Sequence, residues 1–299
     1  MATYNRAHFI VEALLSIQEQ TFVDWECLII NDGGTDSTAE VIASILENDK
    51  RFQFLDRPVG YLKGLPGCRN YGLNLAKGGY IIFFDDDDCV HPDNLQLSLA
   101  VIQKENTDFC HYQKQSFESS VPDFQFEKPK INQILNQSHL YEILTNQIGL
   151  ASCTVLWNKR CFENIRFNEY LLYAEEWECY SRIIAKGHEG VVIENVLYFN
   201  RKHLNSNTGE FYTNNAIRKK SKKDAILLVI KNLRNNGLLS DKIIRYFVQT
   251  ALLYKEYQLF PMILKEAQLS GMQKLKWRIL YALLPVRLYL YNIKKKMAT

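Results

Sequence analysis

The sequence lacks the features that mark several special classes of protein. No uncharged apolar run approaches the roughly 20 residues that a membrane-spanning helix requires. The seven cysteines are odd in number and include no C-x-x-C pair, which argues against a disulfide framework or a zinc site and favours a reduced intracellular compartment. No basic and then apolar signal segment opens the chain. We therefore expect a protein that is neither secreted nor inserted across a bilayer.

Glycine and proline are also scarce, at 14 and 7 residues out of 299. This composition excludes a collagen-like or low-complexity chain. With 47% hydrophobic and 23% charged residues, the sequence is typical of a globular protein that is long enough to bury a substantial core.

Charge is distributed unevenly along the chain. Residues 1–211 hold 18 Lys and Arg against 29 Asp and Glu, a net charge of −11. Residues 212–299 hold 18 against 4, a net charge of +14. An acidic body with a basic tail predicts an anionic partner for the tail.

Helix-like and strand-like segments alternate over the first hundred residues. Helical spacing is expected over residues 7–18, 37–46, 69–76 and from residue 92, and short strands over residues 27–30, 52–55 and 80–84. The second helix opens with a capping box formed by Ser37 and Glu40. This alternation predicts an α/β layered fold with a largely parallel sheet, and long amphipathic helices follow from about residue 212.

Four aspartates, residues 85–88, directly follow the apolar run of residues 80–84. If the chain stays extended, Asp85 and Asp87 point to the same side. Two carboxylates on one side suit Mg²⁺ or Mn²⁺ shared with substrate phosphates, at the strand ends where open sheets bind ligands. The alternative is a solvated acidic loop, against which the abrupt Phe-Phe-Asp junction argues.

Residues 80–92 resemble the strand and DxD motif of the family 2 glycosyltransferases, which are inverting enzymes with the GT-A fold. Residues 3–6 resemble the end of the first strand in that family, residues 29–36 its VDDGSTD turn, and residues 67–72 its ARN.G segment. Because four motifs occur in the family's order, the sequence is identified as a member, of the bacterial surface-polysaccharide type. The resemblance implies a Rossmann-like, mostly parallel sheet flanked by helices, with an added C-terminal helical region.

The resemblance also implies a site for a nucleotide-sugar donor, with UDP the commonest nucleotide in the family and GDP or dTDP still open. The positions that match donor-binding residues are Thr3, Asn5, Asp32, Arg69, Asp85, Asp86 and Arg201. Asp32 matches the carboxylate that binds the base, although an Asp beside Gly33 equally suits a plain turn. Arg69, taken alone, is more typical of a solvated helix arginine.

Inverting transfer needs a carboxylate base and a positive charge on the leaving diphosphate. Residues 172–178 resemble the family's ED motif, with Glu176 in place of the commoner Asp as the base and Glu175 as the runner-up. Acids in a first helical turn also complement the helix dipole, which is the alternative. For the cation, Mn²⁺ or Mg²⁺, the resemblance implies Asp87 as a direct ligand and His203 as a second candidate.

Three regions follow from these motifs. We expect a nucleotide-sugar-binding half over residues 1–100, an acceptor-binding half over residues 101–211 and a basic helical region over residues 212–299. The apolar strand that precedes the first motif in the family is missing here, so we expect a chain of low stability. Residues 205–209 are predicted to be a mobile segment that orders when donor binds.

The basic tail holds four Lys over residues 219–223 and mixes Lys and Arg with aromatic residues over residues 274–296. This pattern predicts an interfacial helix on anionic lipid, and the alternative is a helical subdomain that packs on the body. The family resemblance adds a glycan or lipid-linked acceptor and a cytoplasmic, peripheral location on the inner face of the membrane. No nucleic-acid-binding module accompanies the charge, so nucleic acid is not expected as a partner.

Two other functions remain open from the sequence. An apolar strand followed by Asp-x-Asp also opens the aspartyl-phosphate phosphatases, with residues 86–90 in that place. A non-catalytic nucleotide-binding relative would fit the Glu at position 176 and the missing strand.

Overall fold

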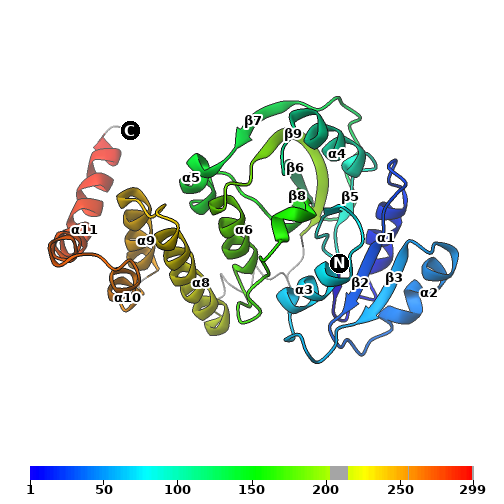
Figure 1. Cartoon of the computed structure of the whole chain (residues 1–299), viewed down its shortest axis with the longest axis horizontal. Helices are drawn as coiled ribbons and strands as arrows, with labels where there is room; N and C mark the ends of the chain where they lie inside the picture. The colour runs from blue at the N-terminus through cyan, green and yellow to red at the C-terminus, as the bar shows by residue number, and fades with distance from the viewer. Residues whose placement is uncertain (203–214, 255, 298–299) are drawn as a thin grey trace. The chain divides into compact units, whose positions relative to one another are not determined.

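The computed structural model describes residues 1–202, 215–254 and 256–297, with side chains given up to Leu283 and at Val286 (Figure 1). The chain forms two compact units, Met1–Ala225 and Ile226–Thr299. The two predicted halves, residues 1–100 and 101–211, both belong to the first unit, which also includes the first residues of the predicted helical region, 212–225.

A parallel three-stranded sheet opens the first unit. Its strands are β1 (Ala2–Thr3), β2 (Cys27–Asn31) and β3 (Phe52–Asp56), in the order β1-β2-β3. Helices α1 (Ile10–Gln18) and α2 (Thr38–Asn48) connect these strands and bury apolar faces with the predicted spacing. All three strands run the same way, so the loops that follow them meet at one edge.

The first strand is short. The sequence predicts that it is missing, whereas the structure has two residues in its place. The Met1 amino group donates a 2.9 Å hydrogen bond to the Leu28 carbonyl oxygen. Beside it lies a groove of about 710 Å³, lined by apolar side chains that include Ile30, Ile82 and Leu156.

The second sheet has six strands and mixes directions. They are β4 (Tyr80–Ile81), β5 (Cys89–Val90), β6 (Phe109–Phe117), β7 (Ile131–Leu135), β8 (Val155–Asn158) and β9 (Gly190–Arg201). Only β6 and β9 are parallel neighbours, so the parallel character predicted from the sequence belongs mainly to the first sheet. Strand β9 is 12 residues long and ends at Arg201.

The remaining helices of the first unit support the loops at the sheet edges. Among residues 1–202 they are α3 (Leu65–Leu75), α4 (Asn94–Glu105), α5 (Leu140–Leu144) and α6 (Glu175–Ala185), with three 3₁₀ turns at Gln137–His139, Ser152–Thr154 and Lys159–Phe162. Helix α3 begins four residues before the predicted start, with Pro66 in its first turn. The predicted capping box at Ser37 is wrong, because Asp36 supplies the oxygen that accepts from the Thr38 amide.

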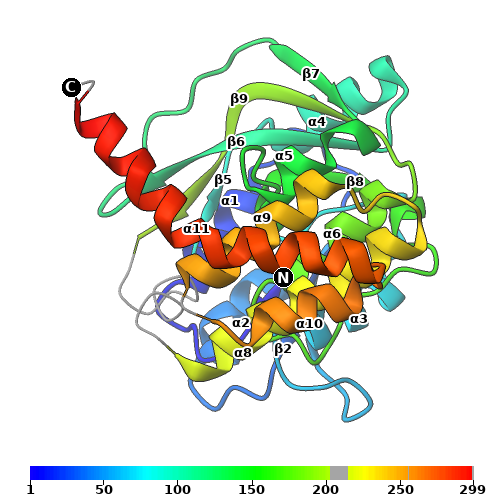
Figure 2. The same ribbon diagram turned by 90° about the vertical axis from the view of Figure 1, so that its left-hand side faces the viewer.

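Helix α8 (Ala216–Asn235) begins in the first unit and ends in the second. The second unit continues with α9 (Asp241–Leu253), α10 (Leu259–Glu266) and α11 (Gly271–Met297), which Figure 2 shows along its length. The rings of Phe260 and Tyr281 stack with their centres 3.9 Å apart and join α10 to α11. No helix within the described residues is both long and apolar enough to cross a membrane.

Candidate active site

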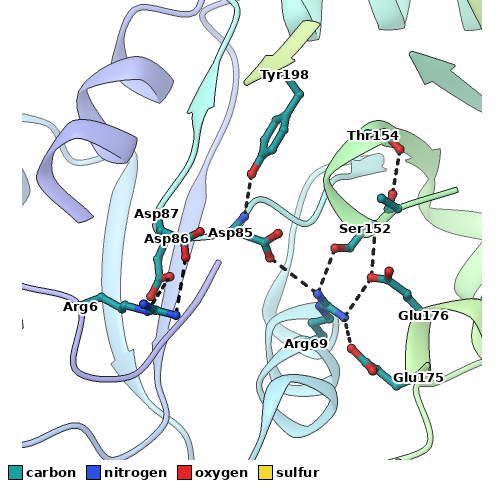
Figure 3. Close-up of polar contacts among 11 residues, drawn as sticks. Arg6, Arg69, Asp85, Asp86, Asp87, Ser152, Thr154, Glu175, Glu176 and Tyr198 are labelled. Atoms are coloured by element: carbon teal, nitrogen blue, oxygen red, sulfur yellow. Dashed lines mark hydrogen bonds and ion pairs between the residues drawn. The ribbon is translucent and has the colours of Figure 1, made fainter. Parts of the chain in front are cut away.

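A cleft of about 420 Å³ in the first unit gathers charged residues from distant parts of the chain. The aspartates that follow β4 line one part of it, and the two glutamates that open α6 line another. Figure 3 shows Arg69, from α3, between these two groups of acids. The cleft therefore unites the two acidic motifs that lie about ninety residues apart in the sequence.

Arg69 is a buried arginine that contacts both groups of acids. Its Nη1 donates to Glu175 Oε1 at 2.9 Å, and its Nη2 donates to Ser152 Oγ at 3.1 Å. Nη2 also lies 3.8 Å from Asp85 Oδ1, and Nη1 lies 3.8 Å from Glu176 Oε2. Arg69 is thus no solvated helix residue, since it contacts acids from two segments and a serine from a third.

The two glutamates of α6 have different surroundings. The Glu175 side chain is 8% exposed and tied to Arg69, whereas the Glu176 side chain is 31% exposed. Glu176 Oε2 accepts a 3.2 Å hydrogen bond from the Ser152 amide. Burial raises the pKa of Glu176, Arg69 opposes the rise, and the charge of Glu175 adds to it. Glu176 is therefore the more accessible carboxylate, with raised basicity.

The aspartates after β4 do not continue as an extended strand. The chain turns at Asp86 and Asp87, whose carboxylates both face Arg6, at 3.5 and 3.6 Å. The prediction that Asp85 and Asp87 point to the same side is therefore wrong, because a turn replaces the extended backbone that it requires. The carboxylate oxygens of Asp85 and Asp88 lie within 4.8 Å of each other.

Electrostatics make this turn a place that favours a cation. Burial, with smaller effects from neighbouring carboxylates, raises the pKa of Asp86 to about 7 and that of Asp88 to about 8. Carboxylate oxygens are the donors that Mg²⁺ and Mn²⁺ prefer. The Cys153 thiol lies beside Asp85 and Asp88, but burial raises its pKa well above its ordinary value and keeps it protonated. The donor set thus fits a hard divalent ion.

Arg201, at the end of β9, donates hydrogen bonds to the turn formed by the aspartates after β4. Its backbone amide donates to Asp88 Oδ1 at 2.7 Å, and its Nε donates to the Asp87 carbonyl oxygen at 3.2 Å. Its guanidinium also pairs with Glu12. Arg201 therefore lines the cleft while its side chain is already bound by protein groups. His203 and the predicted mobile segment, residues 205–209, lie outside the described residues.

Thr3, Asn5 and Asp32 lie together at the ends of β1 and β2 but do not line this cleft. The Asp32 amide donates to the Thr3 carbonyl oxygen at 2.9 Å, and Asn5 Oδ1 accepts from the Thr35 amide at 2.7 Å. Asp32 Oδ1 also accepts from Arg57 Nε at 2.5 Å. The structure thus shows these residues ordering the turn after β2.

Sequence reasoning missed several residues that shape the site. Arg6 is the last residue of the motif at residues 3–6, and its place next to Asn5 was a signal in the sequence that it could belong to the site. Arg57 and Ser152 carry no motif, and only the folded chain places them beside Asp32 and Arg69. Tyr198 lies three residues before the predicted Arg201, but only the fold shows that its hydroxyl accepts a 3.2 Å hydrogen bond from the Asp85 amide.

Comparison with known families agrees with this arrangement. The family model described as glycosyl transferase family 2 matches residues 1–162. An uncharacterized glycosyltransferase of Haemophilus influenzae is 28% identical over 178 residues, which make up 58% of this chain and 69% of that protein. The UDP-Glc:alpha-D-GlcNAc-diphosphoundecaprenol beta-1,3-glucosyltransferase WfgD of Escherichia coli is 26% identical over 167 residues, 56% of this chain and 62% of that protein.

Other relatives are much longer than this chain. The chondroitin synthase of Pasteurella multocida is 38% identical over 109 residues, 36% of this chain. The chain spans 11% of that protein's length, and 18% of the length of an uncharacterized glycosyltransferase of Rickettsia felis.

Solved structures share the fold. Staphylococcus aureus TarS (residues 1–349), crystallised with UDP, superposes with a TM-score of 0.62 at 18% identity, over 83% of this chain and 68% of that one. The mannosyltransferase PcManGT of Pyrobaculum calidifontis, with GDP-Man and Mn²⁺, gives a TM-score of 0.58 at 13% identity, over 95% and 79%. The predicted α/β fold of the GT-A type, with its added C-terminal helices, is thereby confirmed.

Proposed function

The chain belongs to glycosyl transferase family 2, and we propose that it is an inverting glycosyltransferase that uses a nucleotide-sugar donor. The acceptor is a hydroxyl group of a glycan or of a lipid-linked sugar. One observation carries the proposal: the accessible Glu176 and the aspartates after β4 line one cleft and are joined through Arg69.

We propose a UDP-sugar as the donor. The E. coli relative is named for UDP-Glc, and TarS was crystallised with UDP and with UDP-GlcNAc. Asp32 and Asn5, with Thr3, are proposed to bind the nucleoside at the ends of β1 and β2. The Asp32 carboxylate accepts hydrogen bonds from the Arg57 side chain and from the Gly64 amide. These bonds hold the carboxylate in one orientation, in which we propose that it contacts the base.

Asp87 is the proposed ligand for Mn²⁺ or Mg²⁺. Asp85 and Asp88, whose carboxylate oxygens lie within 4.8 Å of each other, are proposed to bind the same ion or its waters. When bound, such an ion supplies Lewis-acid stabilisation to the departing diphosphate. Asp86 pairs with Arg6 and is proposed to hold the turn, on the donor side of the cleft. Arg201 keeps Asp88 in place through its backbone amide.

Glu176 is proposed to take the proton from the acceptor hydroxyl as that oxygen attacks the anomeric carbon. The Ser152 amide orients one of its carboxylate oxygens, and its raised pKa makes it a stronger base than an ordinary glutamate. Glu175 neutralises Arg69 and thereby limits how far Arg69 suppresses the basicity of Glu176. Each acid of the pair thus has a separate task.

We further propose that α11 lies on an anionic membrane surface, which would place the enzyme at the inner face of the cell membrane. Its residues Leu275, Ile279, Leu283 and Val286 share a helical face and are each at least half exposed. Lysines flank this face, as in helices that bind interfacially. Sedimentation with phosphatidylglycerol vesicles, and none with phosphatidylcholine vesicles, is the expected result.

The phosphatase alternative is not favoured. An aspartyl nucleophile must be reached by substrate, yet Asp86 is 6% exposed and faces Arg6. The non-catalytic alternative predicts nucleotide binding without turnover, so a transfer assay separates it from the main proposal.

The proposal is tested by thermal shift with UDP, GDP, dTDP and CMP, each with and without Mn²⁺. We expect stabilisation by UDP that requires Mn²⁺ and is lost in Asp87→Asn. The exposed Glu163→Gln serves as the control and should keep the wild-type response. No shift with any nucleotide, on protein that melts cooperatively, would contradict the proposed donor site.

A further inference from the structure

The active-site cleft carries a lysine that the proposed reaction does not use. Lys222, on α8, lines the cleft together with Glu176 and Trp177. Its ammonium nitrogen lies 3.9 Å from the centre of the Trp177 ring, which is itself buried. A cation over the face of a tryptophan is an attractive arrangement.

Lys222 differs from the other cations of the cleft. Arg6, Arg69 and Arg201 each form ion pairs with carboxylates, and Lys114 is exposed to solvent. Within the part of the chain that the structure describes, no carboxylate is paired with Lys222. Burial alone lowers the pKa of Lys222 to about 8. A partly buried ammonium without a counter-charge is costly, so an anion that enters the cleft would be favoured there.

The position of Lys222 is fixed by bonds between α8 and the segment before α6. Ser221 Oγ accepts from the Tyr173 amide at 3.0 Å and donates to the Tyr173 carbonyl oxygen at 2.8 Å. The Arg218 guanidinium donates to the Leu172 carbonyl oxygen. Because this segment leads directly into α6, the same contacts hold the lysine in register with Glu176.

Resting on the proposed glycosyl transfer, we propose that Lys222 and Trp177 form a subsite for a phosphoryl group carried by the acceptor. The three donors of the ammonium match phosphoryl oxygens, and the indole ring offers an apolar surface beside them. The aspartates after β4 carry the opposite charge and would repel the same group. The enzyme would accordingly select acceptors that bear a phosphate or diphosphate near the attacking hydroxyl.

The test is calorimetric titration of glucose 1-phosphate, and separately of methyl glucoside, into protein already saturated with UDP and Mn²⁺. The nucleotide fills the donor side, so binding reports the rest of the cleft. We expect glucose 1-phosphate to bind more tightly than methyl glucoside. Lys222→Gln should weaken glucose 1-phosphate about tenfold, as expected for the loss of a charge-assisted hydrogen bond, and leave methyl glucoside unchanged. Lys222→Arg should restore most of the loss.

Lys220→Gln is the matched control, because it removes the same charge from the same helix at a side chain that is 78% exposed. Equal weakening by Lys220→Gln would mean that only the net charge of α8 matters, and would overturn the subsite. Equal affinity of the wild type for glucose 1-phosphate and methyl glucoside would also overturn it, while UDP binding would leave the transferase proposal intact. If UDP does not bind, the same titration is run without nucleotide; Lys222-dependent binding of glucose 1-phosphate there would support the subsite and contradict the proposed donor site.

Discussion

Arg69 and Glu175 form a buried ion pair, with Nη1 and Oε1 2.9 Å apart. This pair leaves Glu176, the next residue along α6, as the carboxylate that is partly open to the cleft. The same arginine also approaches Asp85 from α3, so one side chain couples the proposed base to the proposed cation site. The proposed division of labour between the two glutamates follows from this pairing.

Removing that arginine should be strongly destabilising. Arg69→Met leaves the Glu175 carboxylate buried without its partner, which typically costs about 3–5 kcal/mol. Urea unfolding at pH 7 measures the loss. Lys130→Met, which breaks an exposed pair with Glu127, is the control and should leave the urea midpoint nearly unchanged, because water screens exposed ion pairs. Similar losses for both variants would show that the buried pair has no special role.

Two glycines of α3 should respond oppositely to alanine. A Cβ at Gly67 would lie 1.9 Å from the Leu62 carbonyl oxygen, so the loop or the helix must move. A Cβ at Gly72 would meet Ile30 at 3.8 Å, an ordinary contact. We expect Gly67→Ala to lower the melting temperature and Gly72→Ala to add about 0.5–1 kcal/mol through helix propensity. A neutral Gly67→Ala would contradict the close approach.

The groove beside β1 should bind an N-terminal extension of that strand. Five apolar residues engineered in front of Met1 would continue β1 along β2 and bury against Ile82 and Leu156. Burial of even one large apolar side chain is worth about 1.5–3 kcal/mol, so the melting temperature should rise. A Gly-Ser extension of equal length is the control. If both extensions leave the melting temperature unchanged, the groove does not bind a strand.

Asp108 should make stability depend on acid pH. Burial alone would raise its pKa, but hydrogen bonds from His188 and Arg160 hold that pKa below its usual range. A depressed carboxylate pKa stabilises the fold above the unfolded value, about 3.9, and this contribution is lost as pH falls further. Urea titrations should therefore show Asp108→Asn less stable than wild type at pH 7, with the difference shrinking near pH 3. A pH-independent difference would contradict this account.

The sequence predicted the parts of the fold that local pattern determines. Strands at residues 27–30 and 52–55 and the helix over residues 7–18 are found close to their predicted bounds, because apolar periodicity survives folding. The start of α3 was placed too late, since Pro66 and Gly67 read as loop residues until their backbone is seen in a first turn. Tertiary context decided that boundary.

Only the site residues that belong to short sequence motifs could be predicted. Glu176 and the aspartates followed from short segments, but their link through Arg69 and Ser152 joins residues more than eighty positions apart. The prediction that Asp85 and Asp87 point to the same side is wrong, because the chain turns at Asp86 and Asp87. Lys222 looked like one member of a basic run, and only the contact of α8 with the segment before α6 places it in the cleft.

The most direct test of the central claim is the rate of UDP release from UDP-sugars, with product stereochemistry read by NMR, in wild type and Glu176→Gln. The account predicts inversion at the anomeric carbon. It also predicts a fall in kcat of about 10²–10⁴-fold, typical for loss of a general base, with UDP affinity unchanged. A Glu176→Gln variant that turns over at the wild-type rate, or a product that retains configuration, would contradict the assignment of Glu176 as the base.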